Sequence, residues 1–279
     1  MSLDPSTVGF QTEPLVYEYD FRQTILYALG VGATRDELDF LYEGRGPRVL
    51  PSFAVVPAYG PAPLLFERTG CDLLRLLHFA QTVRLHRAIP AAGKLSTVGM
   101  VKGIYDMKKF GQVVLETRTT ERGEPLFDTE WTLFIRDDGG FGGARPPKEN
   151  IPKPERDQTP SFVSTLATTP EQALLYRLSG DLNPLHADPD FANRAGFPEG
   201  PILHGLCTFG IMTRALVRHL SGDERRVRAI GAQFRKPVWP GDSIRTEGYD
   251  VGGGRFALEA FAADRPDPVI SNAWAEVSP

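Results

Sequence analysis

Residues 176–186 read Y-R-L-S-G-D-L-N-P-L-H, and residues 201–205 read P-I-L-H-G. The first stretch places a carboxylate (Asp181), an amide (Asn183) and an imidazole (His186) within six positions. The glycine before them permits backbone dihedrals that other residues resist, and the proline keeps Asn183 out of the helical region. A short, stiff loop of this kind can aim the carboxylate and the imidazole at one point, as acid–base chemistry on a single water molecule requires.

The same residues also have a purely structural interpretation. Asp and Asn before Pro are ordinary turn formers, and Asp188-Pro189 is an ordinary helix start. Composition alone leaves both interpretations open. The full string, with the segment G-P-I-L-H-G at residues 200–205, resembles the signature of hydratase 2 enzymes in the MaoC-like, (R)-specific enoyl-CoA hydratase family.

Composition narrows the class of protein. The chain has 279 residues, 41% hydrophobic content and a net charge of −4 without a long basic run, so nucleic acid is not an expected partner. Neither Cys71 nor Cys207 has a metal or redox spacing, and Cys207 is expected to be buried. No apolar stretch is long enough to span a membrane. The absence of a signal peptide and of a peroxisomal address predicts a cytoplasmic protein.

The two halves of the chain have similar residues at positions 149 apart. The helix expected after Asp20 corresponds to the one expected after Thr169, and Gln23 and Tyr27 correspond to Gln172 and Tyr176. Near each end the offset falls to 143, where a Pro-bearing turn is followed by a Trp in both halves. The order and spacing of these matches predict an internal duplication.

The second half has the clearer pattern. A strand near 161–167, a short helix and the polar loop precede a long apolar helix from Gly205 to about His219, and four strands follow near 226–234, 243–251, 255–262 and 269–277. A long helix wrapped by an antiparallel sheet is the hot-dog arrangement of the family. The resemblance and the duplication together predict an α+β double hot dog. The first copy is expected to hold its own long helix near Leu64–Thr82.

These observations predict three segments. Residues 1–136 form a non-catalytic hot-dog repeat, residues 137–160 form a linker rich in Gly, Pro and charge, and residues 161–279 form the repeat with the hydratase 2 motif. In the first half, the counterparts of the three polar residues are Gly32, Thr34 and Glu37. Because only one copy carries the polar set, the duplication favours a working site in the second half.

The resemblance implies a reaction: reversible addition of water to a trans-2-enoyl-CoA, giving a (3R)-3-hydroxyacyl-CoA, without a cofactor. Asp181 and His186 would hold the water, and which of them is the base stays open. Asn183 would hold that water or orient His186. The N–H of Gly205, at the positive end of a helix, would stabilise the enolate oxygen. His204 is expected to be structural.

Other assignments follow from weaker signals. Arg177, Arg235 and Lys236 are candidate contacts for the phosphates of CoA. No metal is expected, because no second His has a ligand spacing near His186, and no Gly-x-Ser-x-Gly elbow indicates a hydrolase. Alternatives are a dehydratase acting on acyl-carrier-protein substrates, an idle acyl-thioester binder and a thioesterase. A homodimer is expected because hot-dog proteins usually pair.

Overall fold

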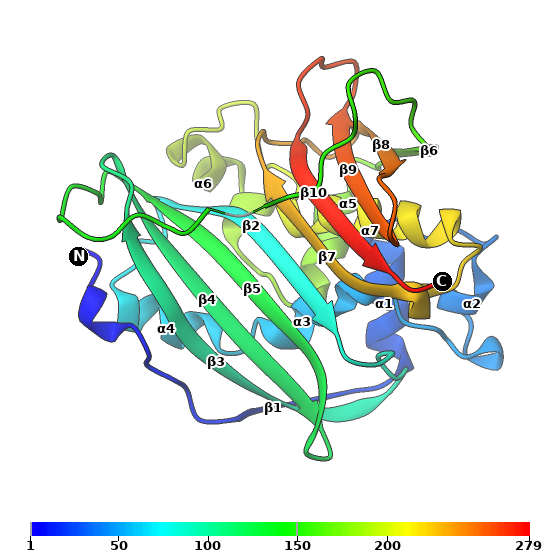
Figure 1. Cartoon of the computed structure of the whole chain (residues 1–279), viewed down its shortest axis with the longest axis horizontal. Helices are drawn as coiled ribbons and strands as arrows, with labels where there is room; N and C mark the ends of the chain where they lie inside the picture. The colour runs from blue at the N-terminus through cyan, green and yellow to red at the C-terminus, as the bar shows by residue number, and fades with distance from the viewer. Residues whose placement is uncertain (1, 149) are drawn as a thin grey trace.

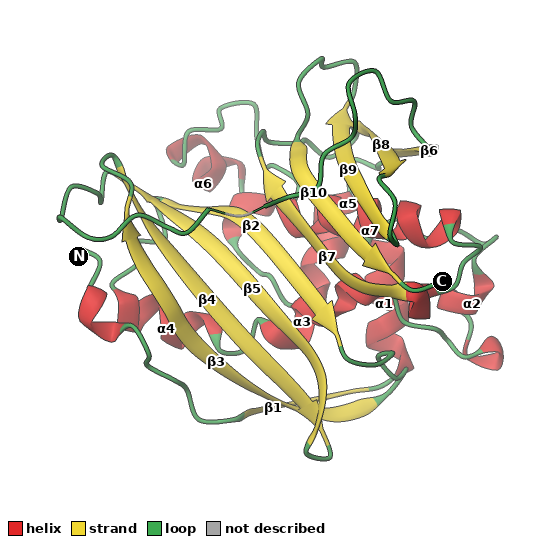
Figure 2. Cartoon of the chain, in the orientation of Figure 1, coloured by secondary structure: helices red, strands yellow, loops and turns green. Residues whose placement is uncertain are grey.

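A single antiparallel sheet runs through the whole molecule. The structure is a computed structural model that describes residues 2–148 and 150–279. Within these residues the sheet has ten strands in the order β1-β3-β4-β5-β2-β7-β10-β9-β8-β6. The helices lie behind this sheet in the view of Figure 1, and Figure 2 separates the two layers by colour. The apolar core therefore lies between one face of the sheet and the helices.

The strands and helices alternate in two similar series. The strands are β1 Leu15–Tyr19, β2 Leu76–Leu85, β3 Gly93–Asp106, β4 Phe110–Glu121, β5 Glu124–Arg136, β6 Phe162–Ala167, β7 Val227–Phe234, β8 Ser243–Asp250, β9 Arg255–Ala262 and β10 Ile270–Val277. The helices are α1 Phe21–Gly30, α2 Leu38–Leu41, α3 Val55–Ala58, α4 Ala62–Thr69, α5 Gln172–Tyr176, α6 Pro189–Arg194 and α7 Gly205–His219.

The strand order is a mirror image about the middle of the sheet. Reading outward from the centre, β2, β5, β4, β3 and β1 of the first half match β7, β10, β9, β8 and β6 of the second. The equivalent strands β2 and β7 pair with each other, with Ala80 opposite Gln233 and Thr82 opposite Gly231. Two hot-dog units thus share one sheet, which confirms the α+β double hot dog expected from the sequence.

The prediction of a long helix near Leu64–Thr82 was wrong. In its place the first half has a short 3₁₀ turn at Pro51–Ala54 and the short helices α3 and α4, and the chain is already extended in β2 from Leu76. Pro57 and Pro61 interrupt the helical hydrogen bonds, and Gly70 ends α4 in a left-handed conformation with φ of 73°. The central helix of the first copy is therefore broken into pieces.

The long helix of the second half confirms its prediction. α7 runs from Gly205 to His219, and all of its residues from Leu206 to Val217 are buried. The helix is buried on all sides because the sheet covers one side and the first-half segments cover the other. Cys207 is fully buried, as expected, and burial raises the pKa of its thiol well above the ordinary value.

Polar contacts bind the two halves beneath the sheet. Gln172 donates from Nε2 to the main-chain oxygen of Gly30 at 2.7 Å, which joins α5 to the end of α1. The guanidinium of Arg214, on α7, binds the carboxylate of Glu37 with Nε 2.9 Å from Oε1. Both side chains of this ion pair are buried, with exposed fractions of 4% and 11%. The first half therefore fixes the position of α7.

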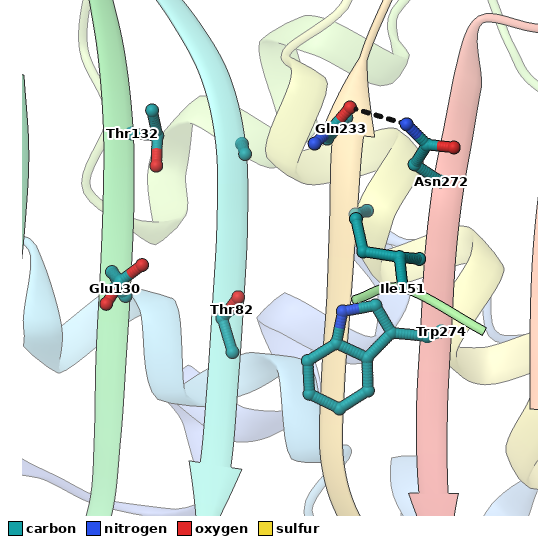
Figure 3. Close-up of a pocket in the computed structure, with 9 residues that line it drawn as sticks. Thr82, Glu130, Thr132, Ile151, Gln233, Asn272 and Trp274 are labelled. Carbon is teal, nitrogen blue, oxygen red and sulfur yellow. Dashed lines mark hydrogen bonds between the residues drawn. The ribbon is translucent and has the colours of Figure 1, made fainter. Parts of the chain in front are cut away.

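The segment between the halves crosses the outer face of the sheet (Figure 1). Its beginning is held by Asp106, whose carboxylate accepts hydrogen bonds from the N–H groups of Gly140 and Gly142. Further along, Ile151 covers a shallow polar hollow between the central strands, shown in Figure 3 with Gln233 bonded to Asn272. This hollow lies on the face away from the helices. The proposed repeat boundaries stay a prediction.

Among the described residues, no helix is both long and apolar enough to cross a membrane.

Candidate active site

The loop after α5 arranges the three polar residues through its own hydrogen bonds. Asp181 Oδ1 accepts from the N–H of Asn183 at 3.2 Å. Asn183 Oδ1 accepts from the N–H of Leu185 at 3.0 Å and so caps a 3₁₀ turn over Pro184–His186. Gly180 has a φ of 124°, which a residue with a side chain would resist. Asn183 therefore caps the turn that ends at His186, and its role in catalysis stays a prediction.

His186 is buried and presents one ring nitrogen as a hydrogen-bond acceptor. Its Nδ1 lies 2.8 Å from the main-chain oxygen of Ile202. A carbonyl oxygen only accepts, so Nδ1 carries the hydrogen and Nε2 of the neutral ring keeps its lone pair. Burial lowers the pKa of His186, and the charge of Asp181 opposes this effect. A neutral imidazole with a free Nε2 is suited to accept a proton from water.

Asp181 and His186 lie close enough to share one water molecule. One carboxylate oxygen of Asp181 and one ring nitrogen of His186 are within 4.8 Å of each other. Two acceptors that each bind the same water at about 2.8 Å are about 4.5 Å apart. The carboxylate is half-buried and lines a pocket, so a substrate can approach from the pocket side.

The sequence did not predict that His204 lies against His186 and Asp181. Its ring stacks on that of His186, with 3.6 Å between the ring centroids and 25° between the planes. Its Nε2 lies 3.1 Å from the main-chain oxygen of Asp181. Its structural role stays a prediction, and it contacts both candidate catalytic residues. The P-I-L-H-G segment contained this signal, because it places a second His directly before the long helix.

Gly205 begins α7, as the motif suggested. The first N–H groups of a helix have no acceptor within the helix, and the helix dipole favours negative charge there. The ring of Phe234 covers the α-carbon of Gly205: a β-carbon built on Gly205 would lie 3.2 Å from Phe234 Cδ1. Glycine is thus needed at this position for the approach of an aromatic ring, and its N–H stays a candidate donor to a thioester oxygen.

Both halves line the pocket beside Asp181. The second half contributes Asp181 and three further residues, and the broken helix of the first half contributes the rest; the lining residues are Val55, Val56, Tyr59, Tyr176, Ser179, Asp181 and Leu206. The empty space, part of it open to solvent, is about 240 Å³. The lining combines apolar walls with a few polar groups, in a hollow smaller than the usual ligand pocket of about 300–1,000 Å³. The interruption of the first-half helix places Tyr59 in this lining.

The three candidate CoA contacts lie in different surroundings. Arg177 reaches the main-chain oxygen of Leu182 at 3.5 Å and so contacts the catalytic loop itself. Arg235 is exposed, lies over the ring of Phe79 and donates to a serine hydroxyl. Lys236 is exposed and pairs with Asp267 at 2.9 Å. Arg235 and Lys236 directly follow Phe234, the residue that covers Gly205. Their roles stay predictions.

The same cluster has some features of a metal site. Asp181, His186 and His204 each offer a possible ligand atom, and these atoms lie within 4.8 Å of one another. However, one nitrogen of each imidazole already faces a main-chain oxygen, and the two rings are stacked. The donor set therefore fits water better than a tetrahedral ion.

Comparison with known proteins identifies the family. Residues 17–137 match the MFE-2 hydratase 2 N-terminal domain, and residues 152–264 match the MaoC like domain. The 3-hydroxyacyl-thioester dehydratase Y of Mycobacterium tuberculosis is 44% identical over 278 residues, covering 95% of this chain and 94% of the relative. The chain belongs to the MaoC-like hydratase 2 family. The resemblance read from the motif is thereby confirmed.

Further members of this hydratase 2 family are similar over nearly the whole chain. The probable enoyl-CoA hydratase 2 of Dictyostelium discoideum is 32% identical and covers 98% of this chain and 95% of the relative. The solved MaoC-like dehydratase of Phytophthora capsici has a TM-score of 0.87 at 28% identity, covering 99% of this chain and 98% of that structure. The similarity therefore includes both halves of this hydratase 2 protein.

Proposed function

We propose that this protein catalyses the reversible hydration of trans-2-enoyl-CoA to (3R)-3-hydroxyacyl-CoA. The observation that carries the proposal is the pair of acceptors, the Asp181 carboxylate and a His186 ring nitrogen, within 4.8 Å of each other beside a pocket. Membership of the hydratase 2 family supports it, as do relatives named for enoyl-CoA hydration and for dehydration of hydroxyacyl thioesters.

The proposed chemistry begins with a water molecule that donates one hydrogen bond to each acceptor. Its lone pair is then free to attack C3 of the enoyl group. As the oxygen–carbon bond forms, one acceptor takes a proton from the water and the π electrons move toward the thioester oxygen. C2 then receives a proton from the acceptor pair, so Asp181 and His186 end the cycle in the protonation state in which they began it.

The thioester oxygen gains negative charge as C3 is attacked. A preorganised donor at that point lowers the barrier by more than it strengthens substrate binding. We propose that the N–H of Gly205 is this donor, because it lies at the start of a fifteen-residue helix. Asn183 contributes by capping the turn that carries His186.

The test is the loss of enoyl absorbance with trans-2-enoyl-CoA of short, medium and long chains. The stereochemistry of the product is read with an (R)-specific 3-hydroxyacyl-CoA dehydrogenase. We expect hydration to the 3R product, with a chain-length profile that reflects the pocket. A folded protein that hydrates no CoA ester of any length, or that gives the 3S product, overturns the proposal.

A carrier-protein substrate is the second candidate. It is favoured by the relative named as a 3-hydroxyacyl-thioester dehydratase, because that name leaves the carrier of the thioester open. The discriminating assay compares the same acyl group on CoA and on acyl carrier protein. A kcat/KM at least about tenfold higher on the carrier protein would favour the dehydratase of a carrier-bound pathway.

We further propose a cytoplasmic homodimer. The dimer is supported by the way hot-dog units associate: in this chain, two such units already join through the central strands β2 and β7. Sedimentation velocity measures the mass in solution, and a single species at 30.8 kDa would contradict the dimer. Cell fractionation tests the location.

A further inference from the structure

His204 contacts both members of the catalytic pair without lining the pocket. Its Nε2 lies 3.1 Å from the main-chain oxygen of Asp181, and its ring lies 3.6 Å from the ring of His186 between centroids. A third ring, that of Tyr176, lies 4.9 Å away and is tilted by 54°. With an exposed fraction of 1%, His204 is held on several sides by these neighbours.

The hydrogen-bond pattern fixes the chemical state of His204. A carbonyl oxygen cannot donate, so the Nε2 facing Asp181 carries the hydrogen. Burial is the main cause that lowers the pKa of His204 well below its ordinary value, and the nearby ring of His186 adds to it. The ring is therefore neutral, and its N–H donates to the main chain rather than to a substrate.

We propose that His204 is a positioning residue: its N–H holds the main chain of Asp181 and its ring holds the plane of His186, so that both acceptors stay at the separation one water molecule needs. The inference rests on the proposed hydration at this site. The position of His204 in the chain adds to the effect of this residue, because it directly precedes Gly205, the candidate oxyanion donor. The side chain of His204 thus contacts two parts of the site, and its main chain leads directly into the third.

Two substitutions separate the two contacts. His204→Phe keeps a flat ring for stacking on His186 but removes the N–H that reaches Asp181. His204→Gln keeps an N–H at the position of Nε2 but removes the ring. The matched control is His219→Phe, because His219 also stacks on an aromatic ring, that of Phe162 at 4.7 Å, but lies at the far end of α7.

The expected kinetic result is a fall in kcat for both His204 variants of about 10- to 100-fold, with KM changed by less than about threefold. His219→Phe should leave both parameters unchanged. In a background of Asp181→Asn, adding His204→Phe should cause little further loss, because a residue that acts through Asp181 has nothing left to position. Circular dichroism and thermal unfolding verify that each variant is folded.

Hydrogen exchange provides a readout that does not need turnover. The amides of residues 181–187 should exchange about tenfold faster in His204→Phe, and less fast in His204→Gln, which keeps the donor. Unchanged kcat and unchanged loop exchange in His204→Phe would overturn the inference, as would losses that simply add to those of Asp181→Asn. If loop exchange changes while the wild-type protein hydrates no thioester, the positioning role stands and the proposed function fails.

Discussion

The loop at residues 181–186 and its counterpart at residues 32–37 follow equivalent helices, α5 and α1, in the two halves of one fold. In the loop at residues 181–186, His186 lies close to Asp181 beside a pocket. At the position equivalent to His186, the loop at residues 32–37 has Glu37. The carboxylate of Glu37 binds the buried guanidinium of Arg214 on α7. One place in the fold thus holds the proposed catalytic histidine in one copy and a structural ion pair in the other.

The difference shows how a duplicated fold divides its tasks. Glu37 also accepts a hydrogen bond from the N–H of Thr34 at 3.1 Å, so its carboxylate closes its own loop as well as binding Arg214. The first copy has in addition lost the continuous central helix, and residues of its fragments, such as Tyr59, line the pocket of the second. The first copy thus supplies a wall of the pocket and an anchor for α7.

The largest expected effect is on turnover in the second-half loop. Asp181→Asn keeps the size of the side chain and one accepting oxygen but removes its negative charge, so the water loses a group that can take its proton. We expect kcat to fall by about 10³-fold or more in the enoyl-CoA assay, while the melting temperature changes little. His186→Gln should behave similarly. Turnover within tenfold of wild type would place the catalytic pair elsewhere.

The counterpart loop should show the opposite sensitivity. Glu37→Gln leaves the buried charge of Arg214 without its partner, so we expect the free energy of unfolding to fall by about 3 kcal/mol. Because Glu37 lies outside the pocket, kcat per folded molecule should change by less than about threefold. Urea unfolding followed by fluorescence measures the stability.

The double variant Glu37→Leu with Arg214→Met is the matched control. It removes both charges, so it should recover most of the lost stability. If instead Glu37→Gln abolishes turnover in fully folded protein, the division of tasks between the loops is wrong.

Buried histidines in both halves predict a loss of stability in acid. Burial lowers the pKa of His186 and His204, and it takes the pKa of His78, on β2, to about 4. In the unfolded chain histidine binds a proton near pH 6.5. The unfolded state therefore binds more protons below that pH, and the free energy of unfolding falls as the pH drops from 6.5, by at most about 1.4 kcal/mol per pH unit for each histidine.

Urea unfolding at a series of pH values measures this slope, and His78→Gln should make it shallower without moving the pH profile of activity. Hydration itself should decline in acid with an apparent pKa below 6.5, because the pKa of His186 is lowered and its neutral ring is the acceptor. If the decline of hydration in acid has its midpoint above pH 7, this assignment is wrong.

The sequence predicted the second half better than the first for a physical reason. The apolar periodicity of α7 and the alternation in β9 are strong local patterns, and both elements lie where they were expected. Gly70, inside the range expected for the long first-half helix, was a local signal against it, but the expectation of symmetry outweighed it. The pairing of Glu37 with Arg214, 177 residues away, has no local pattern at all. The stack of His204 on His186 likewise depends on tertiary packing.

The smallest expected effect concerns the cap of the catalytic turn. Asn183→Ala removes the oxygen that accepts from the N–H of Leu185, at a cost of about 1 kcal/mol in local stability. Because His186 ends that turn, its ring should be less well held, and we expect kcat to fall about fivefold. Asn183→Asp keeps an accepting oxygen and should stay near wild type. Thr34→Ala, the equivalent change in the other loop, should leave kcat unaltered.

These variants distinguish capping from direct participation by Asn183. Capping needs only an oxygen that faces the N–H of Leu185, which aspartate supplies as well as asparagine. Contact with the attacking water or the substrate through the amide NH₂ needs a donor, which aspartate lacks. If Asn183→Asp is as slow as Asn183→Ala, or slower, the amide acts as a donor at the reacting centre, and the catalytic loop then differs from its counterpart by three acting side chains instead of two.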